Sequence, residues 1–157
     1  MNSPEEYFQR FDEPLAQQQI VMEHPEPVKL AELKDIVQSL QDRPYGDMEV
    51  LVLDEVGQRT DVFRDLATQL KKQHDVDTVV VKSPDLAVVV SDELTRAQIE
   101  SIQPPMSNEA DSAVALRAMP ALLDVDPVPG TTMVGITGLL IILTVAVTTR
   151  FAKRSRN

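Results

Sequence analysis

An uncharged run near the C-terminus constrains this chain more than any other feature. Residues 131–149 carry no charged side chain, and within them residues 139–143 are all Leu or Ile. At about 1.5 Å of rise per residue, a helix over this run comes close to the ~30 Å of a bilayer's hydrocarbon core. Four cations that can reach lipid headgroups follow directly: Arg150, Lys153, Arg154 and Arg156. The pattern predicts a transmembrane helix over 131–149 with the lipid bilayer as a partner, and a buried soluble helix is the alternative.

Small residues recur along one side of that expected helix. Thr131 and Gly135 are four residues apart, and Gly138 continues the same side. Small side chains let two membrane helices approach closely, so these residues form a candidate helix–helix contact. Such short matches are common by chance, so a homo-oligomer is the alternative and is not the expectation.

Charge divides the chain sharply. The four cations after the run leave a net charge of −14 on residues 1–149, because the whole chain carries −10. Binding to DNA or RNA depends mostly on Lys and Arg contacts to phosphate, so we expect no nucleic-acid partner. The chain has no cysteine, which excludes disulfides, thiolate nucleophiles and Cys-ligated metals.

Pro, Gly and hydrophobic periodicity divide the rest of the chain. We expect a partly ordered arm over 1–27, an acidic α/β domain over 28–123, a Pro/Gly linker over 124–130 and a basic tail over 150–157. The apolar residues of the arm, such as Tyr7 and Phe11, either pack on the domain or form a docking motif.

The spacing of apolar residues predicts the elements of the domain. Helices are expected over 28–41, 60–74, 92–101 and 108–119, and strands over 48–53, 76–82 and 86–90. Pro104 and Pro105 are expected to end the third helix. The last two strands should be antiparallel neighbours, and the crossover from the first strand to the second should be parallel and right-handed. The predicted fold class is a small two-layer or three-layer α/β sandwich with a mixed sheet, plus one C-terminal transmembrane helix.

Four features of the chain belong together: residues 50–53, 64–68 and 78–84, and the late apolar run that ends before Arg150 and Phe151. As a set, they resemble a family of small single-pass membrane proteins of mycobacteria and corynebacteria. The soluble part resembles a divergent TPM domain, although residues 86–90 depart from the TPM pattern. The resemblance implies an actinobacterial cell envelope and an association with cell-wall remodelling or division. It also implies phosphatase activity or divalent-cation binding as an alternative.

Four carboxylates are the candidate ligand site. Asp54 and Glu55 follow the first expected strand, at the end where open α/β sheets bind ligands, and Asp61 and Asp65 lie one turn apart on the next helix. Their oxygens could hold Ca²⁺ or Mg²⁺; otherwise these side chains form a solvated face. No catalytic residue is assigned, because Ser83 lacks a nucleophile elbow and the two histidines, His24 and His74, are expected to be solvated on the surface.

The sequence therefore predicts a non-enzymatic accessory module with an unidentified protein partner in the envelope. The rival hypothesis is a metal-dependent phosphatase that uses the acidic crevice. The cations after residue 149 favour an orientation with the tail in the cytoplasm and the domain outside the plasma membrane, and the reverse orientation is the alternative.

Overall fold

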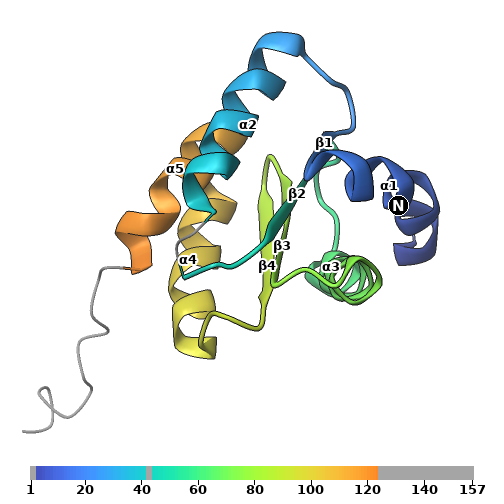
Figure 1. Cartoon of the computed structure of the whole chain (residues 1–157). Helices are drawn as coiled ribbons and strands as arrows, with labels where there is room; N and C mark the ends of the chain where they lie inside the picture. Colours follow the sequence, from blue (N-terminus) through green and yellow to red (C-terminus); the bar gives the residue numbers. More distant parts are fainter. Residues whose placement is uncertain (1–2, 42–43, 124–157) are drawn as a thin grey trace, which may run out of the picture. The chain divides into compact units, whose positions relative to one another are not determined.

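A four-stranded sheet with helices on both faces forms the described part of the protein (Figure 1). The computed structural model describes residues 3–41 and 44–123. The strands are β1 Ile20–Met22, β2 Met48–Val52, β3 Thr78–Ser83 and β4 Leu86–Ser91. The helices are α1 Pro4–Gln18, α2 Pro27–Leu40, α3 Thr60–His74, α4 Arg96–Asn108 and α5 Ser112–Leu123.

The sheet is mixed, as the sequence predicts. Its order is β1-β2-β3-β4, with β1, β2 and β3 parallel and β4 antiparallel to β3. Both crossovers, through α2 and through α3, advance in the same direction along the sheet, yet the two helices pack in cores on opposite faces. The crossovers therefore have opposite hands, and one of them departs from the right-handed rule.

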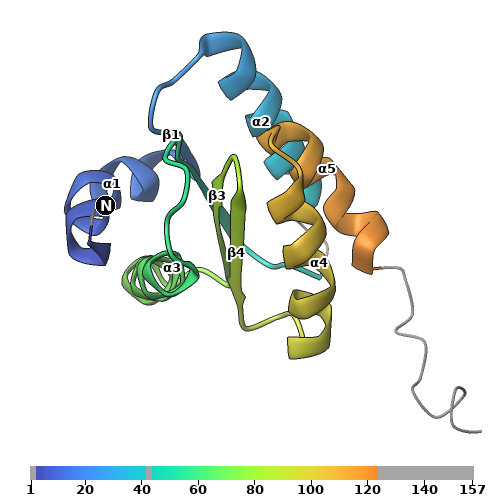
Figure 2. The same ribbon diagram turned by 180° about the vertical axis from the view of Figure 1, so that it is seen from behind.

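Two hydrophobic cores, one on each face, explain why β2 and β3 are buried at every position. Alternate side chains of a strand point to opposite faces of the sheet. Those on one face, such as Val50 and Val80, pack under α2, α4 and α5. Those on the other face, such as Leu51 and Val81, pack under α1 and α3. Figures 1 and 2 show these two helical layers on either side of the sheet. The architecture is therefore a three-layer sandwich, and strands covered on both faces read as continuous apolar runs.

The N-terminal segment belongs to this sandwich. Ser3 caps α1 in a capping box with Glu6, and Tyr7, Phe11 and Leu15 lie buried on the face that packs against α3. Strand β1 then adds to the edge of β2, a pairing that the sequence analysis missed. Three residues are too few to show a period, and only the partner strand supplies their hydrogen bonds.

The expected end of the third helix is wrong. Helix α4 runs through Pro104 and Pro105 to Asn108. Both prolines are exposed, so the carbonyls one turn before them, which lose their donors, lie on a solvent-facing side. Tertiary contacts hold the helix together: Ile102 and Met106 are buried, and Ser107 Oγ lies 2.9 Å from the backbone N–H of Ala87, which donates to it.

The predicted fold class also needs correction at its C-terminal end. The structure shows an α/β domain with a mixed sheet, and none of the helices within residues 3–41 and 44–123 is long and apolar enough to cross a membrane. The transmembrane helix expected over 131–149 is therefore not supported by the structure. That run, including Thr131, Gly135, Gly138 and the cations from Arg150 to Arg156, lies outside the described residues.

Candidate functional site

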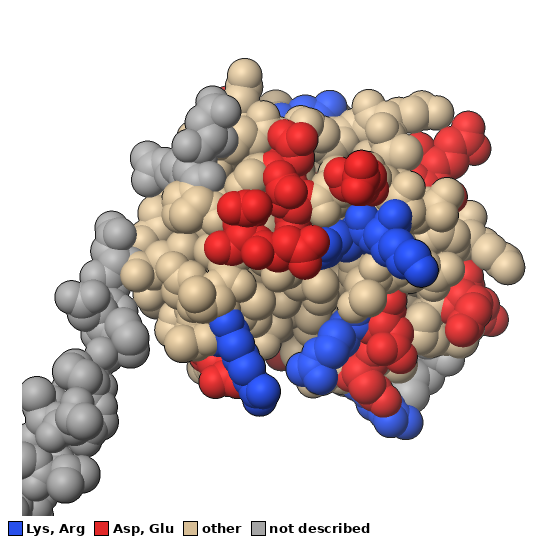
Figure 3. All heavy atoms as spheres, turned by 60° about the horizontal axis from the view of Figure 1, so that its bottom comes forward, with Lys and Arg blue, Asp and Glu red and all other residues tan. Residues whose placement is uncertain are grey.

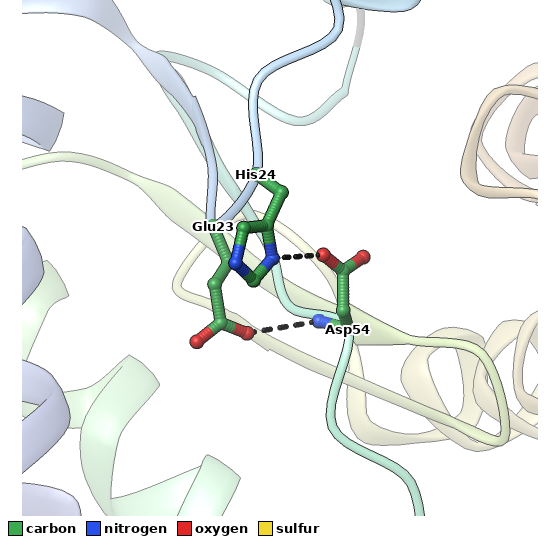
Figure 4. A group of neighbouring side chains, drawn as sticks. All are labelled: Glu23, His24 and Asp54. Carbon is green, nitrogen blue, oxygen red and sulfur yellow. Dashed lines mark hydrogen bonds and ion pairs between the residues drawn. The ribbon is translucent and has the colours of Figure 1, made fainter.

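The carboxyl ends of β1 and β2 bring three possible ligands together. Glu23 and His24 follow β1, and Asp54 follows β2 after one intervening residue. Because the two strands are parallel, these residues meet at the same edge of the sheet, where open α/β sheets bind ligands. Each offers one ligand atom, and these atoms all lie within 4.8 Å of one another (Figure 4).

The three side chains are held in different ways. Glu23, whose side chain is 12% exposed, accepts a hydrogen bond from Arg10 Nη1 at 2.7 Å and another from the backbone N–H of Asp54 at 3.1 Å. His24 Nδ1 lies 2.6 Å from Asp54 Oδ2, and these two side chains are 77% and 54% exposed. Glu23 is thus a fixed anchor, whereas His24 and Asp54 face solvent and are free to meet a ligand.

The structure separates the four carboxylates that the sequence analysis grouped. Asp54 belongs to the edge cluster, but Glu55 accepts a hydrogen bond from the Tyr7 hydroxyl. Asp61 pairs with Arg59, whose hydrogen bond lowers the pKa of Asp61 below its ordinary value, and Asp65 is exposed on α3. Among the described residues, the single group with metal-ligand spacing contains Asp54 and none of the other three.

The donor set decides which cation would suit this edge. Ca²⁺ and Mg²⁺ prefer oxygen ligands alone, whereas an imidazole nitrogen beside two carboxylates suits a first-row divalent ion such as Mn²⁺ or Zn²⁺. An ion there would replace the hydrogen bond between His24 and Asp54, and Glu23 would have to share its carboxylate with Arg10. The three residues are suitable ligands for such an ion. Without an ion, they are held together by hydrogen bonds to one another.

A second cluster, missed by the sequence analysis, surrounds His74. The expectation of a solvated His74 is wrong, because its side chain is only 6% exposed. Nδ1 lies 2.7 Å from Glu49 Oε2, and Nε2 lies 2.9 Å from Asp12 Oδ1. Asp12 comes from α1, Glu49 from β2 and His74 from the end of α3, so no sequence spacing could have joined them.

A third buried group is Lys82 in β3. Its side chain is fully buried on the α2, α4 and α5 face, and Nζ donates to the carbonyl of Ser83. Among the described residues no carboxylate lies within ion-pair distance of it. Burial therefore lowers the pKa of Lys82, although Asp85, Glu109 and Asp111 oppose this from a greater distance.

Surface charge is mixed rather than uniformly acidic. Figure 3 shows the face at the bottom of Figure 1, where acidic side chains gather in one area and Lys and Arg side chains border it. Several exposed or partly exposed ion pairs join residues far apart in sequence, such as Arg117 with Glu32 and Lys29 with Asp111. Such pairs contribute little to stability.

The fold and the edge cluster together define an acidic α/β domain with three candidate cation ligands at the carboxyl edge of a mixed sheet. The family described as membrane protein Rv1476 matches residues 7–157. The match covers nearly the whole chain, and the chain belongs to this membrane protein family. No curated protein matches it.

Proposed function

We propose that this membrane protein is a non-enzymatic accessory module of the actinobacterial cell envelope that binds its partner at the carboxyl edge of the sheet. The observation that carries the proposal is the exposure of three side chains at this edge. His24 and Asp54 face solvent there, and Val56, two residues beyond Asp54 in the loop that leads to α3, is 65% exposed. An apolar side chain beside charged groups that can change partners suits protein recognition.

A phosphatase of the TPM type is the second candidate, and the edge supports it less well. Phosphoryl transfer needs positive groups or a metal ion to offset the charge of the phosphate. Arg10 already binds Glu23, and Arg59 already binds Asp61. A divalent cation held by Glu23, His24 and Asp54 would have to supply the missing charge. The cation is thus part of both proposals, as a structural clamp in the first and as a reactive centre in the second.

The cation proposal predicts a selective gain in stability. We expect Mn²⁺ or Zn²⁺ to raise the Tm of the full chain in detergent more than Ca²⁺ or Mg²⁺ does, because one ligand is an imidazole. Binding to the folded state alone adds about 2.7 kcal/mol when the free ion is 100-fold above its Kd. The measurement is thermal unfolding followed by circular dichroism with each ion in turn.

Two matched variants decide which carboxylate is involved. Asp54→Asn should abolish the metal-dependent rise, whereas Asp65→Asn, an exposed carboxylate on α3 outside the cluster, should leave it intact. If both variants keep the rise, the ion binds elsewhere. If no ion raises the Tm of the unchanged protein, the edge is a purely internal cluster.

We further propose that the described domain faces the outside of the plasma membrane. Residues 150–157 carry four cations and no acidic residue, and residues 1–149 carry the net charge of −14. Retaining cations in the cytoplasm follows the positive-inside rule, and moving them outward against the membrane potential costs about 2.3 kcal/mol per charge per 100 mV.

One experiment tests both the orientation and the docking edge, because the chain contains no cysteine. Val56→Cys should react in intact cells with a membrane-impermeant maleimide that carries a photoreactive benzophenone, and Ser155→Cys should not. Illumination should then link the Val56→Cys protein to one discrete partner. Val114→Cys, at an exposed position on α5, is the control that should be labelled without forming this adduct.

The outcomes separate the two claims. Labelling at Ser155→Cys but not at Val56→Cys would reverse the orientation. Labelling at Val56→Cys with the same adducts as at Val114→Cys would remove the case for docking at the carboxyl edge and leave the orientation standing.

A further inference from the structure

Helix α1 is attached to the rest of the domain by a partly buried row of three side chains, a carboxylate, an imidazole and a second carboxylate. Asp12 on α1, His74 at the end of α3 and Glu49 in β2 follow one another at 2.9 and 2.7 Å. His74 and Glu49 have side-chain exposures of only 6% and 5%. These three polar side chains lie beside the apolar contact that Tyr7, Phe11 and Leu15 of α1 make on the same face of the sheet.

Donor and acceptor chemistry limits the protonation states that Asp12, His74 and Glu49 can share. An ionised carboxylate only accepts hydrogen bonds, and a neutral imidazole has a single N–H. Both ring nitrogens of His74 face carboxylate oxygens, so when Asp12 and Glu49 are both ionised, both nitrogens must carry a proton for the two contacts to be hydrogen bonds. A neutral ring would leave one nitrogen lone pair pointing at a buried or half-buried carboxylate.

We propose that Asp12, His74 and Glu49 form a pH-sensitive contact, called the latch below, that holds α1 against α3 and β2 while His74 is an imidazolium. In this closed state α1 is packed on the domain, and the latch releases α1 as the ring loses its proton. Closure joins three elements through two charge-assisted hydrogen bonds, which are about twice as strong as neutral ones. Deprotonation removes one of these bonds and the positive charge between two carboxylates.

The charged groups around His74 set the direction of the switch. Asp12 faces the ring from α1 and Glu49 faces it from β2, and Asp47 lines the same hollow of about 460 Å³ next to the cluster. Burial alone would lower the pKa of His74, but the hydrogen bonds to Glu49 and Asp12 outweigh it and raise the pKa above the ordinary value. The contribution of the His74 charge to closure is therefore fully present below pH 6.5 and is lost as the pH rises through the raised pKa.

Protonation of Glu49 sets the lower end of the pH range in which the latch is closed. Burial raises the pKa of Glu49, and its hydrogen bond to His74 only partly offsets this. Glu49 therefore gains a proton at a higher pH than an ordinary carboxylate, and the contact to His74 then loses its ionic character. The latch holds best between these two titrations.

Release of α1 would also change the contacts of residues at the carboxyl edge of the sheet. Arg10 on the same helix holds Glu23, and Tyr7 binds Glu55 beside the edge cluster. Opening would free Glu23 from Arg10 and expose the apolar face of α1. This consequence rests on the proposed function of the edge, whereas the latch itself does not.

The test uses the fact that the chain has only two histidines. His24→Gln removes the exposed histidine and leaves His74 as the sole imidazole in the nitrogen NMR spectrum of the full chain in detergent. At pH 6.5, the ordinary pKa of a histidine, His74 should be mainly imidazolium. Above the transition, amide hydrogen exchange of residues 4–18, corrected for the intrinsic pH dependence, should become about 10-fold faster or more.

Two variants of the latch must change this behaviour in opposite ways. His74→Gln should give fast exchange of residues 4–18 already at pH 6.5, with no further opening up to pH 9. Asp12→Asn should keep α1 closed at high pH, because its amide can donate to the unprotonated Nε2 of a neutral His74. A purely structural ion pair would instead be weakened by Asp12→Asn at every pH.

The proposal is overturned by either of two results. One is a His74 that is mainly neutral at pH 6.5, with one protonated and one bare nitrogen. The other is exchange of residues 4–18 that follows the same pH profile in the unchanged protein and in Asp12→Asn. None of these measurements uses a divalent ion or a partner protein, so they fail or succeed independently of the proposed function.

Discussion

Gly46→Ala is expected to lower the stability of the domain by about 2–4 kcal/mol. Gly46 has a φ of +62°, in the left-handed region that L side chains rarely adopt. A Cβ atom built there would lie 2.1 Å from Asp77 Oδ2. That oxygen accepts a hydrogen bond from the backbone N–H of Asp47 at 2.9 Å, so it cannot move away without breaking the contact.

The position of Gly46 makes the effect large. Gly46 lies two residues before β2, and Asp77 directly precedes β3, so the clash falls where the two central strands begin. We expect the Tm of the full chain in detergent to fall by roughly 10 °C, measured by circular dichroism.

Gly57→Ala is the matched control for this substitution. Gly57 also has a positive φ, +76°, but a Cβ atom there would meet nothing within 4 Å. It should therefore lose only the backbone contribution, roughly 1–2 kcal/mol. Equal losses for the two variants would show that the contact between Gly46 and Asp77 is looser than in the structure.

Lys82→Met is expected to raise the stability by about 1–2 kcal/mol. The lysine charge is fully buried, its Nζ donates to a backbone carbonyl, and within the described residues no carboxylate forms an ion pair with it. Methionine fills a similar volume without the desolvation of a charge. The gain should appear as a higher midpoint in urea unfolding of the full chain with an unchanged slope.

The pH dependence gives this prediction a second readout. The pKa of Lys82 is lowered by burial, so the folded state binds fewer protons than the unfolded state between the lowered pKa and 10.5. The stability of the unchanged protein should therefore rise with pH in this range, and Lys82→Met should lack that rise.

Two controls separate charge from packing. Lys72→Met, at an exposed position on α3, should change the stability by less than about 0.5 kcal/mol. Lys82→Ala removes the same charge but leaves a cavity, so it should be less stable than Lys82→Met. A loss of stability in Lys82→Met would mean that the Nζ contact to the Ser83 carbonyl outweighs the desolvation.

Local patterns were enough to predict most of the elements. The helical face around Leu33, Ile36 and Val37, the apolar run of β2 and the turn between β3 and β4 all lie within a residue or two of their expected places. These patterns depend on side-chain period and turn chemistry, which are properties of neighbouring residues. Membership in a membrane protein family also agrees with the expectation from the sequence.

Elements and contacts that depend on partners far along the chain could not be predicted in this way. Strand β1 exists because β2 lies beside it, and α4 continues through two prolines because Ser107 and Gln103 bind the backbone of β4. Asp54 could be assigned to the carboxyl edge from its place after a strand. Glu23 and His24 could not, because the strand that places them was not visible.

The sequence by itself determined the acidic α/β sandwich, the mixed sheet and the placement of Asp54, because each follows from residues close together in the chain. Only the tertiary structure decided that His24 joins Asp54, that His74 lies between Asp12 and Glu49, and that Lys82 is buried without a carboxylate partner. Burial and pairing of a charged side chain are set by which elements pack over it. That packing joins residues as far apart as Asp12 and His74, and no local pattern records it.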